Sequence, residues 1–142
     1  RWWGEASRRF SEETENRLVV ALSDADLDLE ATSTARSRLN LANVLDTASQ
    51  RNIPVLVVGP TPTLDEQRNA RLAELNAAYL DVADRRNHVY VDTFTPLVGH
   101  EQWRSDLASG QGRPGQAGHG LIAWLVLHRG WYQWLGLPEP TA

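Results

Sequence analysis

The chain has 142 residues, with 14 basic and 18 acidic side chains, a formal net charge of -4 and 42% hydrophobic residues. This composition supports one domain over residues 1–142 and excludes a disordered polar chain, while a pI near 5.5 with scattered arginines argues against nucleic-acid binding. The absence of cysteine excludes disulfides, thiolate metal sites and a cysteine nucleophile, and no apolar run is long enough to span a membrane.

The first half of the chain predicts a helix, a strand, a second helix and a second strand. Residues 4–16 are polar, charged and free of proline, which favours an exposed helix. Residues 17–22 and 53–58 are short apolar runs rich in β-branched side chains, as in strands that are buried on both faces. Apolar residues recur every three or four positions over 34–51, which predicts a helix with one buried face.

The second half predicts two more helices around a third strand. Residues 63–66 have the form of a capping box, so a long helix is expected to begin at Thr63. A short strand follows at 88–91, then a long, loop-rich stretch over 93–115 that holds Trp103, and a final helix over 116–128. Three tryptophans at helical spacing are expected to pack in the core: Trp124, Trp131 and Trp134.

Helices and strands therefore alternate along the chain, which is the pattern of a parallel sheet covered by helices and makes the fold class α/β. In such sheets ligands gather at the carboxyl ends of the strands. The segments that follow residues 22, 58 and 91, together with the loop before the last helix, are accordingly the places where we expect a functional site.

Three segments resemble the SGNH or GDSL hydrolase family. Arg113-Pro-Gly-Gln-Ala-Gly-His119 resembles the closing block of the family, in which a catalytic histidine is followed by proline, three residues and glycine. Residues 19–26 are placed like the strand that ends in the family's Gly-x-Asn-Asp, and residues 53–62 like the next strand and loop. The resemblance implies ester-hydrolase ancestry without a cofactor. It also implies a flavodoxin-like three-layer parallel sheet with helices on both faces, from which the N-terminal strands are missing.

The chain departs from the family at the catalytic positions. Family members take a nucleophilic serine and oxyanion donors from two early blocks, and we expect this chain to begin after both. In the third block the family's glycine corresponds to Ser23 and its asparagine to Ala25, with only Asp26 retained. In the last block the histidine corresponds to Arg113 and the aspartate before it to Gly110, so no catalytic position is intact.

The chemistry of these replacements predicts that ester turnover is impaired. A serine needs a neighbouring base that accepts a proton, and a guanidinium has no acceptor atom and stays protonated. Ala25 offers only a methyl group where an oxyanion donor, worth about 10²–10³ in rate, is required. The fixed charge of Arg113 suits a carboxylate, phosphate or sulfate, so the former cleft is expected to bind a small anionic ligand or an acyl substrate.

Other polar side chains near these positions complete the predicted site. His119 is expected to pack at the start of the last helix, Ser23 to be either a turn residue or a nucleophile, and Asp26 to cap a loop. No histidine has a partner at metal-ligand spacing, so no metal site is predicted. The residues predicted to bind a ligand are Ser23, Asp26, Thr61, Arg113 and His119.

Two further functions remain open. The chain could be an active esterase or lipase whose nucleophile comes from a missing N-terminal segment. That segment, or another copy of the chain, would cover the strand edge at 17–22, which is otherwise an aggregation hazard. Alternatively, the chain could be an interaction module that docks through its tryptophan-rich ends, including Trp2 and Trp3.

Overall fold

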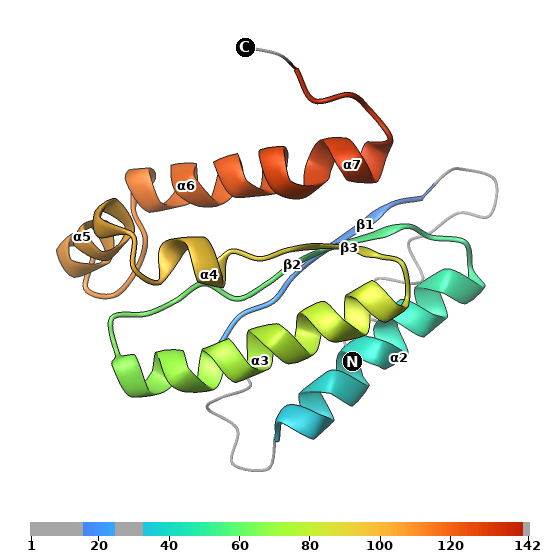
Figure 1. Cartoon of the computed structure of the whole chain (residues 1–142), viewed down its shortest axis with the longest axis horizontal. Coiled ribbons are helices and arrows are strands. Elements are labelled where there is room, and N and C mark those ends of the chain that lie inside the picture. The colour runs from blue at the N-terminus through green and yellow to red at the C-terminus, as the bar shows by residue number, and fades with distance from the viewer. Residues whose placement is uncertain (1–15, 25–32, 141–142) are drawn as a thin grey trace.

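The fold is described for residues 16–24 and 33–140 of a computed structural model (Figure 1). Several predicted features lie outside the described residues. They are the helix over 4–16 up to its last residue, the pair Trp2 and Trp3, and the two site positions Ala25 and Asp26.

The centre of the fold is a parallel sheet, as predicted. Strands β1 (Leu18–Ala21), β2 (Val55–Val58) and β3 (Val89–Val91) lie in the order β1-β2-β3, and both neighbouring pairs are parallel. All four residues of β2 are buried, because helices cover both of its faces. The parallel arrangement brings the carboxyl ends of the three strands to one side of the molecule (Figure 1).

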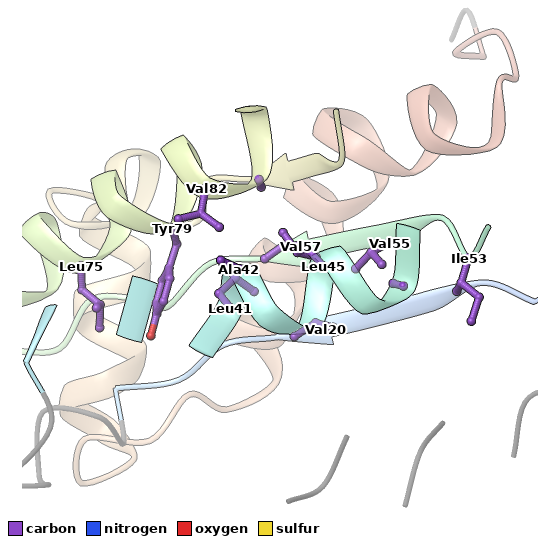
Figure 2. Packing of buried hydrophobic residues seen from close by; sticks show 12 residues of the cluster. Val20, Leu41, Ala42, Leu45, Ile53, Val55, Val57, Leu75, Tyr79 and Val82 are labelled. Carbon is purple, nitrogen blue, oxygen red and sulfur yellow. The ribbon is translucent and has the colours of Figure 1, made fainter. Parts of the chain in front are cut away.

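Two long helices cover one face of the sheet. Helices α2 (Thr34–Gln50) and α3 (Glu66–Arg85) pack side by side below the strands in Figure 1. Apolar residues recur along both helices at helical spacing. These residues pack against the sheet in a cluster of aliphatic side chains and one tyrosine. Figure 2 shows this cluster, which includes Val20, Leu41, Leu45, Val57, Leu75, Tyr79 and Val82.

Shorter helices cover the opposite face, so the predicted three layers are present. Here the chain forms α4 (Phe94–Leu97), α5 (Glu101–Ser109), α6 (Gln116–Val126), the π-helix η2 (Leu127–Trp131) and α7 (Tyr132–Leu135). None of the helices formed by the described residues combines the length and apolar character that crossing a bilayer requires. The second core cluster contains Leu56, Val91, Leu97, Trp103, Leu107 and Leu125.

The predicted capping box at Thr63 is wrong. Helix α3 begins at Glu66, and Asp65 is its N-cap, since the Asp65 carboxylate accepts hydrogen bonds from the backbone N–H groups of Gln67 and Arg68. The Thr63 backbone N–H instead donates to Asn69 Oδ1 at 2.7 Å. Aspartate is as good an N-cap as threonine, and the contact with Asn69 decides between them.

The loop-rich stretch predicted over 93–115 is also wrong, because it contains α4 and α5. Trp103 lies on α5 and is only 1% exposed, and its Nε1–H donates to the Pro62 carbonyl at 3.2 Å. Helices this short carry little periodicity and gain most of their stability from tertiary packing, so the sequence pattern alone did not indicate them.

The last predicted helix continues beyond residue 128 through a π-helical turn. Leu125 and Gly130, five residues apart, both become buried, whereas Arg129 between them is exposed. A regular α-helix would have directed position 129 toward the sheet. Trp131 and Trp134 pack against the second cluster as predicted, but Trp124 is 52% exposed and is therefore not a core residue.

His88 lies at the amino ends of the strands and links β2 to α2. Its Nδ1 accepts a hydrogen bond from the Val55 backbone N–H at 3.3 Å, which leaves the proton on Nε2, 3.0 Å from Ser49 Oγ. Burial is the main cause that lowers the pKa of His88 in the folded protein. The neutral ring is thus the form that the fold stabilises.

We expect the free energy of unfolding to decrease as pH falls through about 6.5, where the unfolded chain takes up the proton first. Denaturant unfolding between about pH 7.5 and about pH 5 should show this dependence. The variant His88→Gln should flatten it, whereas His119→Gln, at an exposed position, should not. Equal pH dependence in all three proteins would contradict this role of His88.

Candidate functional site

The site predicted from sequence lies where the strands end. Figure 1 shows β2 and β3 running toward the left, and the turn between α5 and α6 lies on that same side of the molecule. The segments that contain Ser23, Thr61 and Arg113 are therefore all directed to the carboxyl edge of the sheet, as the motif order predicted. The structure gives no contact that joins these three side chains.

The turn after β1 is held to α3 by an ion pair. Leu22 N–H donates to the Val58 carbonyl at 2.8 Å and extends the strand pairing by one residue. Asp24 Oδ2 accepts from Arg68 Nε at 2.8 Å, and Arg68 Nη2 donates to the Asp24 carbonyl at 3.2 Å. Because its carboxylate is occupied by a guanidinium, Asp24 is not placed to orient a histidine base for Ser23.

Ser23 is exposed at the rim of a cavity of about 270 Å³ between β1 and α2. The floor of this cavity is apolar, and its polar groups are hydroxyls and one amide. None of the described lining residues carries a charge, so the described lining offers an anion hydroxyl and amide donors but no cation. The cavity is lined by Val20, Ala21, Leu22, Ser23, Ser37, Asn40, Leu41, Val44 and Tyr79.

The loop after β2 is fixed to the end of β3. The buried hydroxyl of Thr93 lies 2.9 Å from the Gly59 carbonyl and 3.1 Å from the Pro60 carbonyl, to which it donates. Thr61 follows this anchor and is partly exposed. The sequence placed Thr61 correctly in the loop after the strand, and the structure shows that Thr93 anchors the start of that loop.

A partly buried polar network, missed in the sequence, lies under this loop. Tyr90 Oη donates to Asn76 Oδ1 at 2.6 Å, and Asn76 Nδ2 donates to Asp92 Oδ1 at 3.1 Å. Burial raises the pKa of Tyr90 far above its ordinary value, so the hydroxyl keeps its proton and acts as a donor. A Cβ at Gly59 would overlap the Tyr90 hydroxyl, which explains the glycine there.

Asp92 serves α4 as well as the network. Its Oδ1 also accepts from the Thr95 backbone N–H at 3.0 Å. The Asp92-x-x-Thr95 spacing was the available signal for this cap, since aspartate commonly accepts from the N–H three residues ahead. Because Asp92 Oδ1 accepts two hydrogen bonds from within the fold, this carboxylate has a structural role.

The turn between α5 and α6 contains Gly110 and Arg113, the two positions of the closing block that depart from the family. Gln111 and Gly112 have positive φ angles of 55° and 89°, and Arg113 N–H donates to the Gly110 carbonyl at 3.1 Å, which closes the turn. Arg113 is exposed. Within the described part of the chain its guanidinium takes part in no hydrogen bond or ion pair.

His119 is exposed in the first turn of α6, so the expectation that it packs at the start of this helix is wrong. The buried residues of α6 are Gly118 and Leu125, which defines the face that meets the sheet and α5. His119 directly follows Gly118 and is therefore turned about 100° away from that face.

Asp106 on α5 caps α6 and was not found in the sequence. Its Oδ2 accepts from the backbone N–H groups of Gly115 at 2.6 Å and of Gly118 at 2.9 Å. The N-cap residue Gly115 has no side chain to do this. A Cβ at Gly118 would lie 2.6 Å from this carboxylate oxygen and 2.7 Å from Pro114 Cβ, so the glycine of the matched block is required by packing.

Removal of this cap is expected to destabilise the fold by about 1–2 kcal/mol in Asp106→Ala, because two N–H groups at a positive helix end lose their acceptor. Asp106→Asn keeps an acceptor oxygen and should lose less. Thermal unfolding measures both, with the exposed neighbour Ser105→Ala as the control. A melting temperature of Asp106→Ala equal to that of the control would contradict the capping role.

The remaining histidines have structural partners away from Ser23. His100 Nδ1 accepts from the Trp103 backbone N–H at 3.3 Å as the N-cap of α5, and His128 Nδ1 lies 2.7 Å from Glu139 Oε1. The pair of His88 and Ser49 lies at the amino ends of the strands, opposite the site. Across residues 16–24 and 33–140, no group of three or more potential ligands comes together to hold a metal ion.

Comparison with known proteins agrees with the α/β fold. The sequence model of the GDSL-like lipase/acylhydrolase family matches residues 5–121. Among solved structures, the lipase/acylhydrolase from Enterococcus faecalis is similar, with a TM-score of 0.66 and 19% sequence identity over 92% of this chain and 67% of that one. At this identity the likeness shows the fold. No curated protein sequence matches the chain.

Proposed function

Since this chain belongs to the GDSL-like lipase/acylhydrolase family, we propose that it is a hydrolase-like domain whose former active-site cleft binds an anion and does not cleave esters efficiently. The observation that carries the proposal is Arg113. This residue stands in the block that resembles the family's closing motif, at the position of the catalytic histidine.

The setting of Arg113 supports binding. Its backbone is fixed in a turn with two positive φ angles, and its exposed side chain has no carboxylate partner among the described residues. A guanidinium offers five N–H donors in a planar fork, which matches the oxygens of a carboxylate, phosphate or sulfate. An arginine whose backbone is held in a turn and whose guanidinium is exposed is suited to bind an anionic ligand.

The proton chemistry opposes turnover. A serine nucleophile needs a base, and Arg113 cannot accept a proton. None of the four histidines has a hydrogen bond to a described serine at the carboxyl edge, and the Asp24 carboxylate is paired with Arg68. Loss of the base alone leaves at most a residual rate of about 10³–10⁴ over water in well-studied triads.

The hydrolysis test uses p-nitrophenyl acetate with the unmodified chain and with the double variant Arg113→His plus Ala25→Asn. The unmodified chain should not exceed the rate of the matched variant Arg129→His, in which an exposed arginine on η2 is replaced instead. Robust turnover by the unmodified chain, lost in Ser23→Ala, would overturn the proposal in favour of an active esterase.

The binding test titrates acetate, phosphate and sulfate while the backbone amide resonances are followed by NMR. Shifts should concentrate in residues 110–119, and Arg113→Gln should weaken binding at least about tenfold, the loss expected for one charge-assisted hydrogen-bonded pair. Arg129→Gln should leave the affinity unchanged. Equal affinity in both variants would show that Arg113 does not form the anion site.

A further inference from the structure

A hollow of about 530 Å³ lies at the amino ends of the strands, on the opposite side of the molecule from the carboxyl edge. Helices α2 and α3 end beside it, and Figure 1 shows α7 at the same end of the molecule. Its volume falls within the range of about 300–1000 Å³ that is typical of small-molecule sites. We call it the amino-end hollow, and its described lining consists of Ser49, Asn52, Ile53, Pro54, Val55, Asn87, His88, Val89, Gln133 and Trp134.

The indole of Trp134, which lines this hollow, has a donor without an acceptor. Its Nε1 is buried, and no hydrogen-bond partner for it occurs among the described residues. The ring contacts Arg17, whose Cζ lies 5.4 Å from the ring centroid, and Trp131, at 5.6 Å between centroids. Neither side chain contains an acceptor atom, because guanidinium and indole nitrogens only donate. A buried donor without a partner is costly and calls for an explanation such as a bound ligand.

Most polar side chains of the amino-end hollow are uncharged amides. Asn52, Asn87 and Gln133 each offer two N–H donors and one acceptor oxygen. All three are exposed, and their side chains form no hydrogen bond within residues 16–24 and 33–140. The described lining carries no formal charge, because burial lowers the pKa of His88 and favours its neutral ring. These amides are therefore available to a ligand.

The pair of Ser49 and His88 adds a hydroxyl donor to the hollow. His88 Nε2, which carries the ring proton, lies 3.0 Å from Ser49 Oγ and donates to it. The hydroxyl hydrogen of Ser49 is then free to point toward a ligand. Because Nε2 already carries its proton, His88 is not placed to act as a base for Ser49. The hollow is accordingly suited to binding and not to nucleophilic catalysis.

Carbon surface lies between these polar groups and indicates the class of ligand. Pro54 and Val89 are partly exposed and line the hollow together with the Trp134 ring. Amides and hydroxyls around a carbon surface match a ligand with several hydroxyl groups on a carbon ring, because a hydroxyl also both donates and accepts. A carboxylate or phosphate would find no cation in the described lining.

We propose that the amino-end hollow binds a neutral polyhydroxylated ligand of the sugar class, and that one ligand oxygen accepts a hydrogen bond from Trp134 Nε1–H. Because Nε1 is buried, this contact requires the indole to turn toward the hollow. The bond gives the N–H the acceptor that the described residues do not provide. The amides of Asn52, Asn87 and Gln133 bind further hydroxyl groups of the ligand. This site shares no residue with the anion site at Arg113 and does not depend on it.

Titration with glucose, cellobiose and myo-inositol tests this site, with the indole N–H resonances followed by NMR. The chain has six tryptophans, and the variant Trp134→Phe identifies the resonance of Trp134 by its loss. This resonance should move downfield and saturate with at least one probe, at a dissociation constant on the order of 1 mM. The backbone amides of residues 49–55, 87–89 and 133–134 should shift with it. The indole resonance of Trp103, which already donates to Pro62, should not move.

Two substitutions test the named donors. Trp134→Phe keeps an aromatic ring and removes the N–H, so it should weaken binding of the saturating probe at least about fivefold, the loss of one hydrogen bond between neutral groups. Gln133→Ala should weaken binding in the same direction. Trp124→Phe and Gln102→Ala, at exposed positions outside the hollow, are the matched controls and should leave the affinity unchanged. Circular dichroism confirms that each variant is folded.

The proposal is overturned if no probe produces a saturating shift of the Trp134 resonance up to about 100 mM, about a hundred times the expected dissociation constant. Linear shifts of equal size with glycerol and with every probe would reveal a solvent effect and would also overturn it. Arg113→Gln should bind the probe like the unmodified chain, and acetate should leave the Trp134 resonance in place. The saccharide site and the anion site can therefore fail separately.

Discussion

Replacement of Gly130 by alanine should destabilise the fold by about 1–3 kcal/mol or more, because the added methyl group has no space. A Cβ at this position would lie 2.5 Å from Val91 Cγ2 and 3.1 Å from Leu56 Cδ1. The π-helical turn brings the backbone of residue 130 directly onto β2 and β3, so η2 would have to move away from the sheet. Denaturant unfolding at a single pH measures the loss.

The matched control is Gly120→Ala on the preceding helix. A Cβ at Gly120 meets nothing within 4 Å, and alanine is the better helix former by about 1 kcal/mol. Glycine-to-alanine substitution should therefore stabilise the protein at position 120 and destabilise it at position 130. A stable Gly130→Ala variant would mean that the close approach of η2 to the sheet does not exist in solution.

Replacement of Trp103 by alanine should cost about 3–5 kcal/mol, the range for a fully buried large aromatic side chain. The indole is 1% exposed within the second core cluster, and its N–H bonds to the Pro62 carbonyl. The variant would lose this packing and leave a buried carbonyl without its donor. Since marginal domains have only about 5–15 kcal/mol in total, partial unfolding at room temperature is expected.

Trp124→Ala is the comparison on the same face of the sheet. Trp124 is 52% exposed, and its ring contact is with His128 at 4.6 Å between centroids. Its removal should change stability by less than about 1 kcal/mol, as for most surface substitutions and exposed ring pairs. Thermal denaturation followed by near-ultraviolet circular dichroism distinguishes the two variants. Similar losses of stability in both would contradict the assignment of Trp103 to the core and of Trp124 to the surface.

Within the closing block, some residues are required by packing and one bears on the chemistry of the site. Gly118 and Pro114 are explained by packing, because Gly118 must lie against Asp106 and Pro114 to start α6. Arg113, one residue before the proline, has no such packing role among the described residues. A change at this position can therefore alter the proton chemistry of the site and leave the fold unchanged, which is the basis of the proposed loss of turnover.

Local patterns in the sequence determined the parallel sheet and its long helices. The apolar runs at 17–22, 53–58 and 88–91 and the helical spacing over 34–51 each concern one element, whose burial follows from its own residues. The identity of residue 113 also fixed its chemistry, because a guanidinium lacks a proton acceptor in any fold.

Only the tertiary structure decided which tryptophan is buried, where α5 forms and which group caps α6. Trp103 and its acceptor Pro62 are 41 residues apart, and Asp106 caps a different helix from its own. The buried position of Gly130 likewise depends on β2 and β3. These features come from contacts between distant segments, and no periodicity within a single segment records the shape of the surface it will meet.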